Sequence, residues 1–198
     1  MLARATLRRV LHFPASPLSD GVVTLRPKTL EDVEAIVEAC QDPEIARWTR
    51  VPSPYTPTEA TGWIEACKGE LEAGTAIDWL VIDAAGAMAG SIGLMDIDRA
   101  RSYGKIGYWV AAPARGRGVA SRALRLVRDW GAGELGLRHI EVLVHERNEA
   151  SLAVARRAGF EDTGQRRVSP REEAPDGRYV VFAAPAPAPA LAPAPSSA

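Results

Sequence analysis

The stretch "PARGRGVASRAL", residues 113–124, places two glycines among three arginines directly before a helical pattern. Gly116 and Gly118 are poor helix residues, yet they stand where an amphipathic helix has to begin. The apolar face of that helix recurs at steps of four, four and three, as Val119, Ala123, Val127 and Trp130. Either the glycines form a plain tight turn, or a ligand has to come very close to the backbone here.

A strand, a glycine-rich turn and a helix N-terminus together form an arrangement that binds phosphate groups. The first N–H groups of a helix have no internal partner and lie at the positive end of its dipole. Glycine lacks the Cβ atom that would keep a phosphate away from them. Arg115, Arg117 and Arg122 add local positive charge. Because Ser121 stands in the third place of G-x-G-x-x-S, the dinucleotide fingerprint is absent, and the Gly-Lys-Ser/Thr loop is missing too.

The composition narrows the class of partner. Lys and Arg number 24 against 25 Asp and Glu, so the chain has no overall basic field and no nucleic-acid partner is expected. Cys40 and Cys67 belong to no CxxC or Cys/His cluster, so we expect reduced thiols and no metal. No run approaches 18 apolar residues, so no membrane partner is expected. These features predict a cytoplasmic protein.

One folded domain is predicted over residues 20–184. Residues 1–19 are interpreted as a flexible basic N-terminal extension, with a transit peptide as the alternative, and residues 185–198 as a disordered Ala/Pro-rich tail. Between them, hydrophobic periodicity and turn signals alternate. Strands are predicted over 21–27, 76–83, 87–98, 105–111, 139–145, 160–168 and 177–183. Helices are predicted from Thr29, from about Thr58, after Gly118 and after Asn148, with a loop over 47–57. This βααβββαβαββ order predicts an α/β (α+β) fold with a mixed central sheet.

Two segments carry a family resemblance, "IGYWVAAPARGRGVASRAL" (106–124) and "NEASLAVARRAGF" (148–160). With them the chain resembles the GNAT acyl-CoA-dependent N-acyltransferases, and within that family the RimJ/RimL-type enzymes that acetylate the N-termini of ribosomal proteins. The first segment contains the signature Q/R-x-x-G-x-G/A as Arg115, Gly118 and Ala120. The second matches the family's N-x-x-S-x-x-x-x-x-x-G-F segment. The resemblance extends from about Gly21 to Phe182 and implies a GNAT fold.

The resemblance also implies a site for acetyl-CoA as co-substrate. In the family the strand before the signature diverges from its neighbour, and the pantetheine arm adds to it like a further strand. Trp109 and Val110 would offer backbone groups to that arm, and the same strand would steady the tetrahedral oxyanion. The amides of the turn would hold the pyrophosphate. The implied cofactor-binding residues there are Arg115, Gly116, Arg117, Gly118, Val119, Ala120 and Ser121, together with Asn148.

The implied catalytic residues are less complete. Ser151 matches the family's serine and is our hypothesis for the group that protonates the leaving thiolate, with Asn148 positioning the helix. An ordinary role in the first turn is the alternative for Ser151. Lys105 stands where relatives often carry an acidic residue, so Asp96 and Asp98 are the nearest carboxylates left for a base. We take Asp96 as the candidate. Strand-end solvation, His145 and a water chain remain the alternatives.

The family's first two helices and their loop roof the acceptor side of the cleft. Trp48, Arg50 and Tyr55 of "RWTRVPSPYTP" (47–57) are therefore candidate acceptor-binding residues. The resulting hypothesis is transfer of acetyl from acetyl-CoA to a primary amine, on a protein N-terminus or a small molecule, by direct attack in a ternary complex. A succinyl-CoA-dependent transferase and a non-catalytic acyl-CoA-binding sensor are the alternatives, and a homodimer is left open as its assembly.

Overall fold

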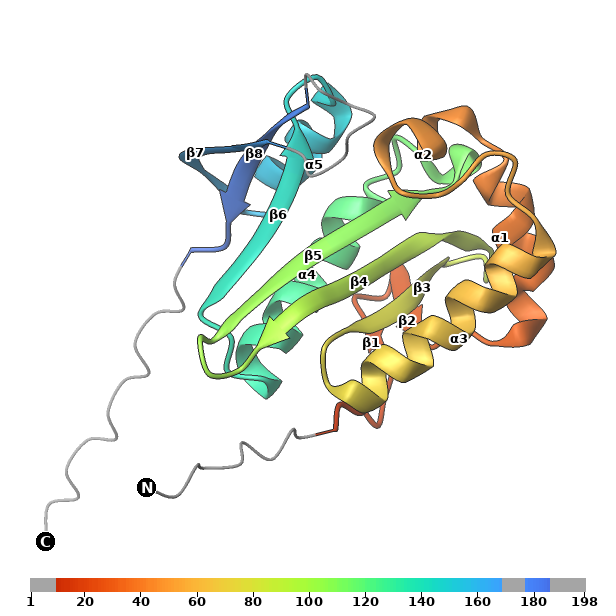
Figure 1. Cartoon of the computed structure of the whole chain (residues 1–198), viewed down its shortest axis with the longest axis horizontal. Helices are drawn as coiled ribbons and strands as arrows, with labels where there is room; N and C mark the ends of the chain where they lie inside the picture. The colour runs from red at the N-terminus through yellow and green to blue at the C-terminus, as the bar shows by residue number, and fades with distance from the viewer. Residues whose placement is uncertain (1–9, 169–176, 186–198) are drawn as a thin grey trace, which may run out of the picture.

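The computed structural model describes residues 10–168 and 177–185, which form an eight-stranded mixed sheet with helices on both faces (Figure 1). The strands lie in the order β1-β2-β3-β4-β5-β6-β8-β7. Their bounds are β1 Leu18–Ser19, β2 Val23–Arg26, β3 Ile77–Asp83, β4 Met88–Asp98, β5 Tyr103–Val110, β6 His139–His145, β7 Glu161–Val168 and β8 Arg178–Ala183. This confirms the predicted fold class.

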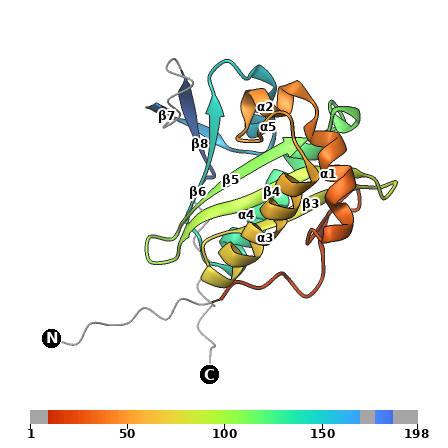
Figure 2. The ribbon, with the colours of Figure 1, turned by 45° about the vertical axis from the view of Figure 1, so that its right-hand side comes forward.

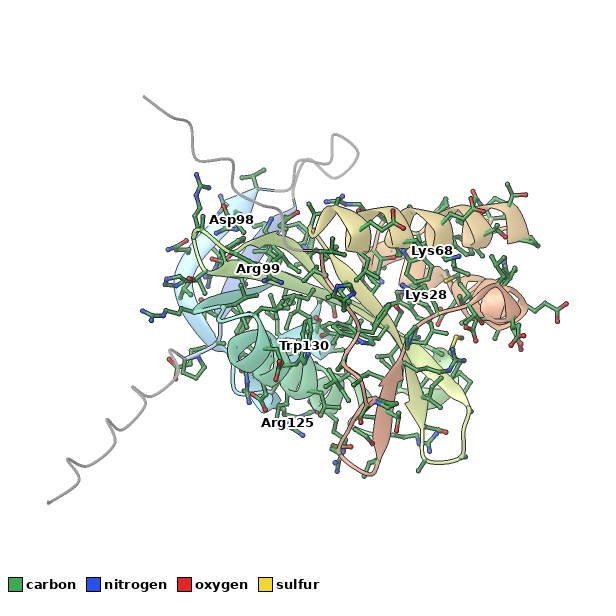
Figure 3. The ribbon with its side chains drawn as sticks, turned by 90° about the horizontal axis from the view of Figure 1, so that it is seen from below. Lys28, Lys68, Asp98, Arg99, Arg125 and Trp130 are labelled. Carbon is green, nitrogen blue, oxygen red and sulfur yellow. The ribbon has the colours of Figure 1, made fainter. Side chains whose placement is uncertain are left out.

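The helices divide between the two faces of the sheet (Figure 2). Their bounds are α1 Val33–Cys40, α2 Pro43–Trp48, α3 Pro57–Ala73, α4 Val119–Glu134 and α5 Glu149–Arg157, with 3-10 turns at Leu30–Asp32 and Ala112–Ala114. In Figure 3, Lys28 beside α3 and Trp130 of α4 lie on opposite sides of the sheet. Trp130 packs edge-to-face on Trp79 at 5.3 Å between ring centroids, and both side chains are buried in the core.

Two elements were not predicted. The helix α2 begins inside the segment interpreted as a break and a loop, because Asp42 and Pro43 that end α1 also start the next helix. The Asp42 carboxylate accepts from the Glu44 N–H at 2.9 Å, and Pro43 occupies the first helical position. The two-residue strand β1 pairs with β2.

The packed region begins earlier than the predicted boundary at residue 20. Leu11 is only 1% exposed, and its N–H donates to the Leu71 carbonyl at 3.3 Å. The Phe13 ring packs edge-on against Trp79. Apolar side chains in the basic N-terminal stretch therefore belong to the core. Residues 1–9 of the predicted extension and residues 186–198 of the predicted tail lie outside the described residues.

The sheet divides between β5 and β6, which run parallel. The two strands pair from Tyr103↔His139 to Ile106↔Val142, and no register continues beyond that point. β5 stays paired with β4 up to Val110, while β6 stays paired with β8 up to His145. The strands therefore diverge toward their C-terminal ends, as Figure 1 shows. We call this opening the β5–β6 gap.

Within the described residues, no helix has both the length and the apolar character that a membrane span requires.

Candidate functional site

A cleft of about 1410 Å³ lies at the β5–β6 gap. It is lined by the last residues of β5 and β6, the first turns of α4 and α5, the α2 segment and part of α3. Nearly all the predicted site residues line it. The cleft therefore brings together segments far apart in the sequence, as the family resemblance implied.

The glycine turn at the start of α4 is required by its backbone conformation. Gly116 and Gly118 have φ of +74° and +76°, a region that side-chain-bearing residues rarely adopt. A Cβ at either position would have no atom within 4 Å, so the space over the turn is open. Gly118 is the N-cap, and the first helical hydrogen bond runs from the Arg122 N–H to its carbonyl at 3.2 Å. The N–H groups of Val119, Ala120 and Ser121 precede that bond and have no helical acceptor.

The local positive charge expected from the three arginines of this stretch is offset, because each of them pairs with a carboxylate. Their ion pairs are Arg115–Asp42 at 2.5 Å, Arg117–Asp83 at 3.1 Å and Arg122–Asp20 at 2.7 Å. The Arg117 side chain does not line the cleft. The arginines tie the turn to α2, β3 and the β1–β2 turn, and the attraction for an anion falls mainly to the α4 N-terminus.

The register of β5 corrects the predicted role of the Trp109 backbone. The Ala111 N–H donates to the Ala89 carbonyl at 2.9 Å, so alternate residues back along β5 turn their backbone groups toward β4. Trp109 is one of these, so its backbone groups pair with β4. Tyr108 and Val110 direct their N–H groups toward the β5–β6 gap. The Val110 carbonyl accepts from the Arg115 guanidinium at 3.2 Å.

A hydroxyl pair crosses the cleft between β5 and α5. Tyr108 Oη lies 2.7 Å from Ser151 Oγ, and the Ser151 N–H donates to the Asn148 side chain at 3.0 Å. Asn148 is the N-cap of α5, so Ser151 lies in the first turn of that helix. The position in the first turn and the contact with Tyr108 are therefore compatible, and the donor role and the ordinary role both fit this geometry. Burial raises the pKa of Tyr108 to about 12, which keeps its hydroxyl protonated at neutral pH. Tyr108 was not predicted as a site residue. It precedes Trp109 in β5, and because strand side chains alternate, the two side chains lie on opposite faces of the sheet.

Asp96, the predicted base, lies at the rim of the cleft. Its carboxylate is 62% exposed and pairs with the Lys105 ammonium at 2.6 Å. Asp98 does not line the cleft, because it accepts from the N–H groups of Ala100 and Arg101 in the β4–β5 turn. Neither carboxylate is directed at the β5–β6 gap by these contacts.

The predicted acceptor residues lie at the α2 side of the cleft. Trp48 packs on His145 with 5.3 Å between ring centroids, and His145 packs on Tyr179 at the same separation. This aromatic row joins α2 to the ends of β6 and β8. Tyr55 lines the cleft but is only 6% exposed, and burial raises its pKa to about 12. Arg50 is exposed on the cleft wall, with no ion-pair partner in the described part of the chain.

Comparison with known proteins accounts for this geometry. A family model for the acetyltransferase (GNAT) domain matches residues 23–161. YdaF of Bacillus subtilis (strain 168), whose name assigns it provisionally to the ribosomal N-acetyltransferases, is 33% identical over 95 residues, which are 48% of each chain. The chain thus spans about half the length of that curated relative. The spermidine N(1)-acetyltransferase of Escherichia coli (strain K12) is 27% identical over 85 residues, or 43% of this chain and 46% of that one.

Solved structures agree in fold. Mycobacterium smegmatis RimJ in complex with CoA-disulfide superposes with a TM-score of 0.73 at 24% identity, covering 85% of each chain. The microcin C7 self-immunity acetyltransferase MccE, solved with acetyl-CoA and AMP, superposes with a TM-score of 0.73 at 19% identity, covering 84% of this chain and 93% of that one. Since the family model covers well over half of the sequence, this chain belongs to the GNAT acetyltransferase family.

Proposed function

We propose that this protein transfers acetyl from acetyl-CoA to a primary amine by direct attack in a ternary complex. The observation that carries the proposal is the meeting, in one cleft, of the β5–β6 gap, the open glycine turn and the Tyr108–Ser151 pair. The relatives support both acceptor classes, since the name of YdaF refers to ribosomal N-acetylation and another relative is a spermidine acetyltransferase.

The residues of the cleft fit acetyl-CoA. The helical N–H groups of Val119 to Ser121 point from the α4 N-terminus under an open turn, which suits a pyrophosphate. The Tyr108 and Val110 N–H groups face the gap, where an extended pantetheine arm would pair with β5.

The cleft holds groups that stabilise the oxyanion and protonate the leaving thiolate. A neutral amine attacks the thioester carbonyl, the C–N bond forms, and the carbonyl oxygen becomes an oxyanion. N–H groups facing the gap stabilise that charge. As the C–S bond breaks, the thiolate takes a proton from the Tyr108–Ser151 hydroxyl pair, which solvent then reprotonates, and the new amide nitrogen loses its extra proton to solvent.

Calorimetric titration with acetyl-CoA and thiol release on an amine panel test the proposal together. We expect acetyl-CoA binding that Gly118→Glu abolishes, because a carboxylate beneath the pyrophosphate repels it. Gly136→Glu is the matched control, since Gly136 also has positive φ and open space but follows the other end of α4. Binding without thiol release from any amine would favour the sensor alternative. A parallel titration with succinyl-CoA identifies the acyl group, and Arg50 is the residue that could meet a second carboxylate.

A further inference from the structure

A second polar group lies on the α3 face of the sheet, centred on Asp78 of β3. The Asp78 carboxylate lies 3.5 Å from the Lys28 ammonium, and both side chains are largely buried. Lys28 also donates to Cys67 Sγ at 3.4 Å and sits 3.9 Å from the centre of the Trp63 ring. Asp78 also lines the cleft, so an acceptor bound in the cleft can approach this largely buried side chain.

The sheet register aims Asp78 toward the β5–β6 gap. Asp78 is opposite Gly93 of β4, and Gly93 is opposite Gly107 of β5, so the three residues form one row on one face. A Cβ at Gly93 would clash with the Asp78 carboxylate, which shows that the carboxylate lies over Gly93. Strands lie about 4.8 Å apart. The carboxylate therefore comes within about one strand spacing of β5, on the side of Gly107.

The far end of the row is covered by a flexible side chain. The methyl group of Met95 lies 2.6 Å from where a Cβ of Gly107 would be, and Met95 is 37% exposed. Because methionine is unbranched and adaptable, it can yield to a slender group lying along the row.

The charges around Asp78 leave room for one more cation. Oxygen atoms of Asp78 and Glu70 and the sulfur of Cys67 lie within 4.8 Å of one another. Burial raises the pKa of Cys67 to about 11, so the thiol is neutral at pH 7. The Lys28 ammonium thus faces two carboxylates, and one negative charge is unbalanced. A metal ion fits poorly, because the ammonium already lies against the neutral thiol.

We propose that Asp78 receives the ammonium group of the acceptor and takes its proton. The inference rests on the proposed acetyl transfer and assigns its base. One proton passes from R–NH₃⁺ to the carboxylate, and the neutral amine then attacks the thioester. After the C–N bond forms, the second proton leaves nitrogen for solvent, and Asp78 later releases its own proton to solvent.

The surroundings of Asp78 suit this task. Burial raises its pKa above the ordinary value, against the opposing effect of Lys28, and so lessens the mismatch with an ammonium group. Facing it are Lys28 from the segment after β2, and Cys67 and Glu70 from α3. The pKa of Glu70 is also raised, first by burial and then by Asp78.

The test is the pH dependence of turnover in Asp78→Asn, measured with a large excess of acetyl-CoA. We expect kcat at pH 7 to fall about 100-fold, a typical size for loss of a general base. We also expect the defect to shrink as the pH approaches the acceptor's own pKa, because solvent then removes the proton. Affinity for acetyl-CoA should not change. A folded variant whose defect is absent, or equal at every pH, overturns the inference.

Two further variants separate chemistry from folding. Asp32→Asn is the matched control, since Asp32 is also a buried partner of a cation, Arg26, but does not line the cleft. It should lose stability and keep the wild-type pH profile. Gly93→Ala keeps the charge of Asp78 and displaces its carboxylate, and should lower kcat with unchanged acetyl-CoA affinity. Unchanged kcat in Gly93→Ala contradicts the inference, whereas a wild-type chain that binds acetyl-CoA and acetylates no amine overturns the proposed function itself.

Discussion

Tyr108 and Ser151 gain their significance from a single contact of 2.7 Å between their hydroxyl groups. If the pair protonates the leaving thiolate, Tyr108→Phe should lower kcat about 100-fold and leave the dissociation constant of acetyl-CoA unchanged. Tyr103→Phe is the matched control, because Tyr103 lies on the same strand but donates to Glu141 away from the cleft. Steady-state kinetics with calorimetry make the comparison. Equal losses in both variants would contradict the donor role.

The pair formed by Asp32 and Arg26 makes stability depend on pH. Hydrogen bonds from Arg26, foremost, and from Thr29 hold the pKa of Asp32 below its ordinary value despite the opposing effect of burial. A lowered pKa stabilises the fold above the unfolded-state pKa, and the gain is lost as pH falls through the folded-state value. Asp32→Asn should therefore cost about 1–3 kcal/mol at pH 7. In urea denaturation the cost should shrink as the pH falls below the ordinary pKa of an aspartate and through the lower folded-state value, and a constant difference would contradict this origin.

At the scale of an element, replacing glycine by alanine should have opposite effects on stability at the start of a helix and in a helix interior. Gly118→Ala at the α4 N-cap should cost about 1–2 kcal/mol, because alanine is strained at φ +76°. Gly62→Ala inside α3, where a Cβ would meet nothing within 4 Å, should instead stabilise the protein by up to about 1 kcal/mol. Thermal unfolding of the two variants checks both signs. A stabilising Gly118→Ala would show that the turn relaxes out of the left-handed region.

Sequence patterns within single segments predicted most helices and strands. The features that were not predicted depend on contacts between distant segments. Thr29, where a helix was predicted to begin, forms a capping box with Asp32, and the signature motifs located the glycine turn and Ser151. Each missing feature depends on residues distant in the chain. The carboxylate that pairs with Arg115 comes from residue 42, and the row from Asp78 to the gap exists only through the register of three strands. No periodicity within one segment carries that information.

For the whole molecule, Leu11 and Phe13, which follow the arginine-rich stretch in the sequence, belong to the core. Leu11 is 1% exposed and packs with residues of β2, β3 and α4 in the larger hydrophobic cluster. Leu11→Ala should therefore cost about 2–5 kcal/mol. Its neighbour Val10 is 50% exposed, so Val10→Ala should change stability little. Chemical denaturation of the two variants measures the difference in their free energies of unfolding. Equally small effects would contradict a core role for Leu11 and favour the predicted domain boundary at residue 20.

The β5–β6 gap also limits which chains can add to the unpaired edge of β5. A strand edge with unpaired backbone groups is a template on which another polypeptide can add, and such edges commonly seed aggregation. Here the unpaired edge of β5 spans residues 107–110, about 13 Å at the usual rise per residue. It lies inside a wedge whose narrow end is closed by the four paired residues of each strand. A strand from another chain would meet that closed end within a few residues. The wedge can therefore form backbone hydrogen bonds with a short, thin ligand but not with an extended strand of a second protein chain.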